Sequence, residues 1–149
     1  MLFRSGTDDG MLDWDAIERR LAGARNYWVA TTRPDGRPHV MPVWGLWLDG
    51  GFAFCTDVAS RKGRNLATRA NVVVHLESGD DVVLLEGRAE RLGQSAILER
   101  FVEDYDAKYA VKVDVSNPAS GFYMVRPQLV QAWREQDFPS SATRWRFHG

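Results

Sequence analysis

Apolar and polar positions follow two different periods along this chain of 149 residues, and each period predicts a different kind of element. Residues 12–26 and 94–110 carry apolar side chains three and four positions apart, with charged residues between them, which is typical of amphipathic helices. A shorter helix is expected from Ser60, a residue type that caps helices well, to about Arg69. The pattern therefore predicts three helices.

Other segments are rich in β-branched and aromatic residues and are interpreted as strands. They are residues 27–33, 38–49, 52–57, 72–77, 82–92 and 121–135, the last being two short strands or one long bent strand. Turn sequences at 34–37 and 49–51 make residues 27–57 an antiparallel meander. Strands joined by short hairpins cannot be mostly parallel. We therefore predict a mainly β fold in which about six antiparallel strands form a small barrel with flanking helices.

Length and composition favour a single domain over residues 1–149, which we divide into three regions. We assign residues 1–24 to an N-terminal helix region, 25–135 to the barrel and 136–149 to a C-terminal tail. The net charge of −1 gives no reason to expect nucleic acid or membrane as a partner. The single Cys55 and the lack of a long apolar run favour a cytoplasmic location.

One stretch, "CTDVASRKGRNL" at 55–66, places cations where a helix already carries partial positive charge. Thr56 and Ser60 offer hydroxyl groups, while Arg61 and Lys62 follow in the first helical turn. Free N–H groups at a helix start bind anions, so these residues form a candidate phosphate site. The alternative is a solvated basic helix with a serine cap.

Pro42 interrupts an otherwise strong strand, and proline belongs at a sheet edge or a bulge because it donates no ladder hydrogen bond. The backbone around it would then be partly unused by the sheet. We predict that Met41, Pro42, Val43 and Trp44 form a ledge for a flat heteroaromatic ring. An ordinary edge strand packed against a helix is the alternative.

The tail combines aromatic rings with guanidinium groups, which suits a ring or a phosphate. The residues concerned are Trp133, Arg144, Trp145 and Arg146. The alternative is a tail whose rings and aliphatic stems simply pack over a neighbouring element.

The remaining chemistry-bearing residues show no catalytic pattern. His39, His75 and His148 have no metal-ligand spacing with one another or with Cys55, although His39 could face the same ligand as Met41. The sequence contains no nucleophile elbow, phosphate-binding P-loop or zinc-protease motif. We name no catalytic side chain and no metal ligand, and infer that a cofactor carries the chemistry.

The order of these segments resembles the pyridoxamine 5′-phosphate oxidase-like, flavin-binding split-barrel superfamily, including its flavin- and deazaflavin-dependent oxidoreductases. The likeness covers roughly residues 25–135 and is most specific at Cys55-Thr56 followed by Ser60-Arg61-Lys62. "GRAERL" at 87–92 resembles a later barrel strand, and the C-terminal segment resembles members assigned to deazaflavin F420.

The resemblance implies a split β-barrel that works as a homodimer with FMN, or alternatively F420, at the interface. Thr56, Ser60, Arg61 and Lys62 would bind phosphate, and the ledge Met41–Trp44 would line the ring. Trp133, Arg144 and Arg146 would reach the site of the partner.

The sequence also departs from pyridoxamine-phosphate oxidases. Met41 and Leu46 stand where those enzymes carry Arg and Lys, and Val82 stands where they carry Gln. The expected function is therefore hydride transfer by FMN or F420 to or from another small organic substrate. The alternative is a non-catalytic flavin- or haem-binding protein, with His39 or His75 as axial ligand.

Overall fold

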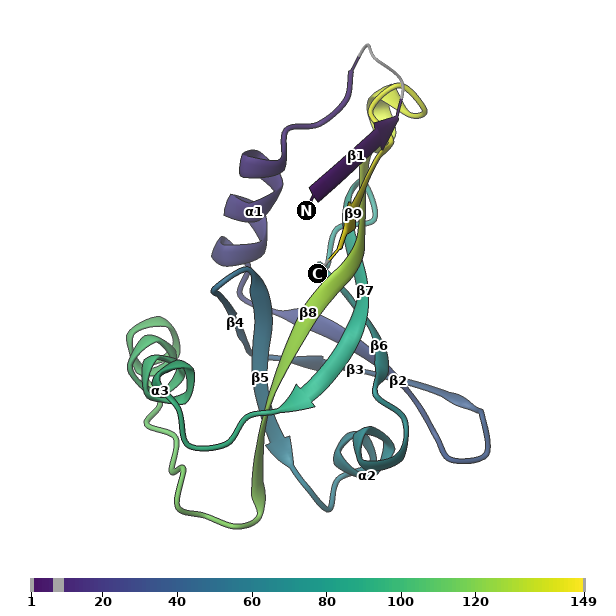
Figure 1. The fold of residues 1–149 in the computed structure, drawn as a ribbon. Coiled ribbons are helices and arrows are strands. Elements are labelled where there is room, and N and C mark those ends of the chain that lie inside the picture. Colours follow the sequence, from purple (N-terminus) through teal and green to yellow (C-terminus); the bar gives the residue numbers. More distant parts are fainter. Residues whose placement is uncertain (1, 7–9, 149) are drawn as a thin grey trace.

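The computed structural model describes residues 2–6 and 10–148 and shows one antiparallel sheet with three α-helices around it (Figure 1). The described strands number nine: β1 Leu2–Gly6, β2 Tyr27–Thr32, β3 Pro38–Val43, β4 Leu46–Leu48, β5 Gly51–Asp57, β6 Asn71–His75, β7 Asp81–Arg91, β8 Ser120–Arg134 and β9 Thr143–Phe147. The helices are α1 Trp14–Gly23, α2 Arg61–Thr68 and α3 Ala96–Tyr109, with a 3₁₀ turn at Glu135–Asp137. The mainly β fold with flanking helices is confirmed.

The main part of the sheet runs in the order β1-β9-β8-β7-β6-β2-β3. The strands β4 and β5 form a second part, which joins the first because β5 also pairs with β8. The first half of β8 pairs with β5, the second half pairs with β9, and β7 runs along the other side of both. In Figure 1, α2 lies at the lower end of the sheet near the end of β5, on the side from which the β2–β3 hairpin extends. This placement brings α2 and the hairpin to the same end of the sheet.

Two clusters of buried residues hold the helices on the sheet. In the first, the Trp14 ring of α1 packs 5.4 Å from Trp145 of β9 and 6.4 Å from Trp47 of β4. In the second, α3 buries Phe101 against Phe122 of β8, with ring centroids 5.6 Å apart. None of the described helices has the length and apolar character needed to span a membrane.

The predicted helices are found, and two tight turns join the predicted hairpins. The turn after β2 closes with the Arg37 carbonyl accepting from the Arg33 N–H at 2.9 Å. The turn between β4 and β5 has positive φ at Asp49 and Gly50, as the two central residues of a type I′ turn require. The first helix ends at Gly23 and not near Asn26.

The segment 38–49 is not one strand, and 27–57 is not a continuous meander. The chain leaves the sheet at Trp44–Gly45, so that β3 pairs with β2 while β4 pairs with β5. A Cβ on Gly45 would lie 2.4 Å from the Phe52 ring, and the Gly45 N–H donates to the Tyr109 hydroxyl at 3.0 Å. The backbone at this point thus bonds to α3 and not to a neighbouring strand.

Residues 136–149, expected to be a tail, contribute a strand of the sheet. β9 pairs with β8 and with β1, and Trp145 is completely buried in the first cluster. Trp145 is thus a core residue and not part of a ligand surface. The strands β1 and β9, together with the split into β3 and β4, account for the difference from the predicted number.

Candidate functional site

The first turn of α2 is held in place by a network of short hydrogen bonds. The Ser60 hydroxyl accepts from the Gly63 N–H at 3.0 Å and donates to the Asp57 carbonyl at 2.6 Å. The Thr56 hydroxyl lies 3.2 Å from that of Ser60. A Cβ at Gly63 would lie 2.4 Å from the Asp57 carbonyl oxygen, so only glycine allows the loop before α2 to pack this closely. Ser60 therefore caps the helix as predicted, and its hydroxyl proton is already donated to the Asp57 carbonyl oxygen.

This network leaves two N–H groups and two cations at the start of α2. Within the described residues, no hydrogen bond uses the N–H of Arg61 or of Lys62. The first turn contains no acidic residue. Burial lowers the pKa of the Lys62 ammonium below its ordinary value, and burial also raises the pKa of the neighbouring Cys55 thiol. The site is thus positively charged and partly shielded from water.

A second group of polar side chains faces α2 from the β2–β3 hairpin. Asn65 lies one turn after Arg61 on the same face of α2, and its amide donates to the Thr31 hydroxyl at 2.9 Å. Thr31 of β2 is directly opposite His39 of β3, so both side chains lie on the same face of the sheet. Arg33, two residues after Thr31, follows on that face.

Several polar atoms of this second group are buried without a hydrogen-bond partner. They are the Arg33 Nε, the His39 Nδ1 and the Asn65 Oδ1. Burial lowers the pKa of His39, and the charges of Arg33, Lys62 and Arg61 lower it further. Sequence reasoning weighed His39 but overlooked Arg33 and Asn65. The i, i+4 spacing of Arg61 and Asn65 was the one available signal.

Pro42 lies on the edge strand β3, as predicted, but the backbone ledge needs correction. A proline cannot donate to the ladder, so the Trp28–Pro42 pair exchanges no hydrogen bonds. Because hydrogen-bonded and non-bonded pairs alternate, the backbones of Met41 and Val43 are used by β2. Only the backbones of alternate residues, Val40 and Pro42 among them, face outward. Met41 and Val43 can meet a ring through their side chains alone.

Trp44 belongs to a stack of side chains beyond the end of β3. Its ring lies parallel to that of Tyr109, with centroids 4.6 Å apart, and the Arg25 guanidinium lies 5.0 Å from its centroid. The Lys108 ammonium donates to the Gly45 carbonyl at 3.1 Å and to the Tyr27 hydroxyl at 2.9 Å. α3 therefore fixes the position of the Trp44–Gly45 segment.

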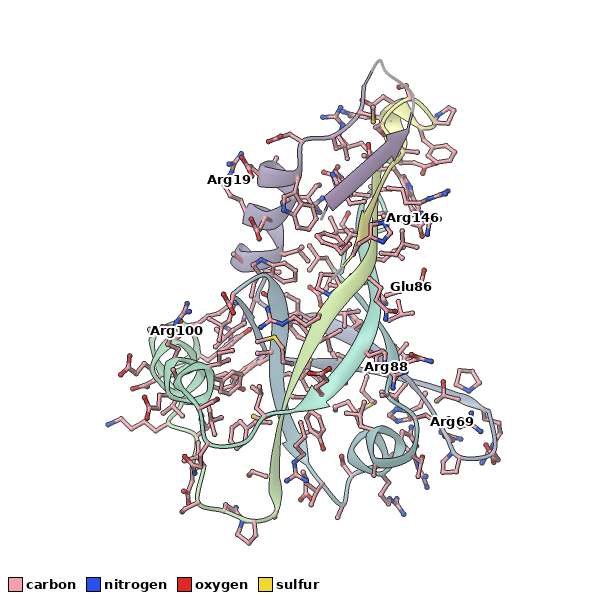
Figure 2. The ribbon with its side chains drawn as sticks, in the orientation of Figure 1. Arg19, Arg69, Glu86, Arg88, Arg100 and Arg146 are labelled. Carbon is pink, nitrogen blue, oxygen red and sulfur yellow. The ribbon has the colours of Figure 1, made fainter. Side chains whose placement is uncertain are left out.

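The predicted residues of the C-terminal segment do not join this site within one chain. Trp133 packs against Phe138 near the far end of β8, with ring centroids 5.9 Å apart. Arg144 and Arg146 are exposed on β9, which lies near the opposite end of the strand order from β3. Figure 2 shows Arg146 beside the upper part of the sheet, well away from Arg69 at the end of α2.

The described surface grooves have volumes of about 240 to 460 Å³. One of them reaches Thr31 and Pro38 of the hairpin, but none is lined by Arg61, Lys62 or His39. We place the candidate site at α2 because of its chemistry and not because of a cavity: buried polar atoms without hydrogen-bond partners lie beside a cluster of cations. The described residues contain no group of three or more His, Cys, Asp or Glu able to hold a metal ion.

Comparison with solved structures shows a widespread fold. A conserved hypothetical protein from Mycobacterium tuberculosis superposes with a TM-score of 0.75 at 22% identity, covering 89% of this chain and 91% of that one. A haem storage protein from Vibrio cholerae superposes with a TM-score of 0.64 at 13% identity, and the match covers 76% of this chain and 89% of that one. A protein described as an F420 reductase superposes with a TM-score of 0.59 at 21% identity, and the match covers 75% of this chain and 94% of that one.

Sequence comparison is more specific. A pyridoxine/pyridoxamine 5′-phosphate oxidase from Rhizobium leguminosarum is 30% identical, with 74% of this chain and 69% of that protein covered. The family description of pyridoxamine 5′-phosphate oxidase matches residues 14–134, which span most of the strands described above. The chain therefore belongs to the pyridoxamine 5′-phosphate oxidase family.

Proposed function

We propose that this protein is an oxidoreductase that binds a flavin or deazaflavin cofactor through the cations at the start of α2. The observation that carries the proposal is the pair Arg61 and Lys62, which lies beside unused backbone N–H groups in a helical turn without acids. Such a turn is electrostatically unfavourable unless an anion binds there. The buried Arg33 Nε, which has no hydrogen-bond partner, supports the same interpretation.

FMN is the cofactor we favour, and F420 is the alternative. The backbone N–H groups and side chains of Arg61 and Lys62 would hold the phosphate, with Thr56 and Ser60 fixing the turn. The side chains of Met41 and Val43 face the same side of the sheet as His39 and would pack against the ring. A bound flavin would supply hydride transfer, so the protein itself needs no catalytic side chain.

The substrate we propose is a small organic molecule other than pyridoxamine phosphate. Met41 provides no charge for a substrate phosphate, and Leu46 is buried in the second core cluster beside α3. The chain would contribute orientation and exclusion of water around the ring.

We further propose that two copies form a homodimer through the outer face of the sheet, defined here by Trp28, Ala30, Val40, Pro42 and Leu84. Val40 is 49% exposed on the edge strand, a high value for an aliphatic side chain in a sheet. Pro38 and Pro42 flank it and prevent a further strand from adding to this edge. Two copies would therefore associate by packing their outer faces together and not by pairing their edge strands. In such a dimer, Trp133, Arg144 and Arg146 would be candidates for contacts with the site of the partner.

A haem-binding function is the rival, and one contact favours it. The His75 Nδ1 lies 2.7 Å from the Leu76 carbonyl oxygen. With its proton on Nδ1, the imidazole presents the Nε2 lone pair, which is the arrangement usual in metal-ligating histidines. Haem titration of the wild type and of His75→Ala separates the two functions. A Soret band that requires His75, together with no flavin uptake, would favour haem.

The direct test is titration of the purified protein with FMN and, separately, with F420, followed by calorimetry and absorption. Arg61→Ala/Lys62→Ala should weaken cofactor binding by about 3–6 kcal/mol if each side chain makes a charge-assisted contact of about 1.5–3 kcal/mol. Arg64→Ala removes an exposed cation from the same helix and should change affinity little. Equal affinity in all three proteins would refute the proposed site. Turnover with reduced nicotinamides or reduced F420 then distinguishes an enzyme from a storage protein.

A further inference from the structure

The face of the β2–β3 hairpin that meets α2 contains two basic side chains, Arg33 and His39, that the proposed phosphate site does not yet use. Asn65 connects α2 to Thr31, and Thr31 is paired directly with His39. Arg33 follows Thr31 on the same face, just after β2 ends. Since Arg61 lies one turn before Asn65, these five polar side chains from the hairpin and from α2 converge on one space between hairpin and helix.

The polar atoms in this space lack partners although they are buried. The Arg33 Nε and the His39 Nδ1 make no hydrogen bond, and one end of the fully buried Asn65 amide is also unpaired. The described ion pairs involve other arginines: Arg37, Arg126 and Arg134. Leaving a buried donor unsatisfied is costly, and a ligand that accepts hydrogen bonds would remove that cost at the Arg33 Nε and at a protonated His39 Nδ1, whereas the Asn65 Oδ1 is itself an acceptor.

We propose that Arg33 and His39 bind a phosphomonoester dianion together with Arg61 and Lys62, and that His39 takes up a proton from solvent as the dianion binds. This inference rests on the proposed function and specifies its ligand. The terminal phosphate of FMN is such a monoester. The phosphate of F420 is a diester and carries a single charge.

The electrostatic environment explains the proton uptake. The charged groups that face His39 are Arg33, from the end of β2, and Arg61 and Lys62, from α2. No carboxylate of the described residues contributes to its lowered pKa, which results from burial and from these three cations. The free protein thus favours neutral imidazole at pH 7.5. A dianion would offset the three positive charges, and the pKa of His39 would rise.

Arg33 and His39 also compensate for the lack of charge further along β3. Met41 is two residues after His39 on the same face of the strand and has no charge. The positive charge needed for a dianion is therefore supplied on this face from the hairpin end. An imidazole that gains its proton only with the ligand avoids a fourth permanent charge in the free protein.

The test is calorimetric titration at pH 7.5 with FMN and with riboflavin, which has the same ring without the phosphate, in buffers of different ionisation enthalpy. Phosphomonoesters are almost fully dianionic at this pH, because their second pKa is about 6. Wild type should take up protons with FMN but not with riboflavin. His39→Asn should lose that uptake. Arg33→Gln should weaken FMN binding roughly tenfold or more, and riboflavin binding hardly at all.

Arg37→Gln is the matched control, because Arg37 is on the same hairpin but forms an exposed ion pair with Asp35 at 2.9 Å. It should leave FMN affinity within about twofold of wild type, as expected for an exposed pair. Arg33→Lys keeps the charge and should retain part of the affinity. Melting curves of all variants identify any loss caused by unfolding.

The outcomes separate this inference from the function on which it rests. If FMN binds and the Arg61/Lys62 variant weakens it, while Arg33→Gln and His39→Asn match wild type in affinity and proton uptake, the inference alone is overturned. Stronger binding of F420 than of FMN, without proton uptake, also overturns it while the cofactor class survives. If neither cofactor binds wild type, both are wrong.

Discussion

The indole of Trp44 and the phenol ring of Tyr109 lie parallel, with their planes within 2° and their centroids 4.6 Å apart. Trp44 follows the edge strand β3, whereas Tyr109 is the last residue of α3, 65 positions later in the chain. The hydroxyl of Tyr109 lies 2.7 Å from the Arg25 carbonyl oxygen and accepts from the Gly45 N–H. One side chain of α3 thus fixes both the ring and the backbone at the end of the proposed cofactor ledge.

Removing only this hydroxyl should destabilise the protein. Tyr109→Phe keeps the stacked ring but leaves the buried Gly45 N–H without its partner, which costs about 1–3 kcal/mol. Denaturant unfolding measures the loss. Tyr105→Phe is the matched control, because Tyr105 is on the same helix and its hydroxyl makes no hydrogen bond within the described residues. A loss as large in the control would show that the Gly45 contact is not the cause.

Lys108 makes the same region sensitive to pH. Burial, with a smaller effect of the Arg25 charge, lowers the pKa of Lys108 to about 8. Between about 8 and the ordinary lysine value of about 10.4, the unfolded chain binds more protons than the folded chain, so this residue makes stability rise with pH. Its contribution is complete above the upper value and is lost as the pH falls through 8.

Lys108→Met should therefore flatten the dependence of unfolding free energy on pH between 8 and 10. Burial raises the pKa of the Cys55 thiol, which opposes the trend, but Cys55 is present in both proteins and cancels in the difference. Lys112→Met removes an exposed lysine from the following loop and serves as control. Parallel pH profiles for wild type and Lys108→Met would contradict the assigned effect.

Local signals in the sequence were sufficient for much of the fold. The hairpin at 34–37 follows from a Pro-Asp-Gly turn, and α3 follows from apolar residues four apart, because both depend on neighbours within one turn. The break at Gly45 depends on contacts with Phe52 and Tyr109, which lie far away in sequence. β9 alternates apolar and charged positions, a strand pattern that the interpretation as a tail overlooked, and its place in the sheet depends on pairing with β8.

The candidate site also contains residues that local sequence signals predict and residues that only distant contacts bring together. Ser60, Arg61 and Lys62 are consecutive, and their arrangement as cap and first turn was predictable from helix-capping preferences. Arg33 and Asn65 joined the site only through the register that places Thr31 opposite His39 and the helix packing that brings Asn65 to Thr31. Burial of a donor without a partner is a three-dimensional property, so the sequence could not reveal it.

Ser60 should matter for stability even without a ligand. Ser60→Ala removes the acceptor of the Gly63 N–H and should cost about 1 kcal/mol, whereas Ser60→Gly should cost only a few tenths. Thermal unfolding of the three proteins gives the comparison. If the cap also fixes the phosphate-binding turn, FMN affinity should follow the same order. Equal stability of Ser60→Ala and wild type would mean that the cap contributes nothing measurable.

The proposed dimer makes a prediction about Val40. Val40→Asp places a charge on the outer face at a site that is already 49% exposed, so the fold of one copy should be retained. Burying that carboxylate against a second copy is costly, so sedimentation should show monomers where wild type gives dimers. Val115→Asp, at a loop position with 38% exposure, controls for the added charge. If Val40→Asp remains dimeric while Val115→Asp dissociates, the interface involves the loop after α3 and the face defined by Val40 is free.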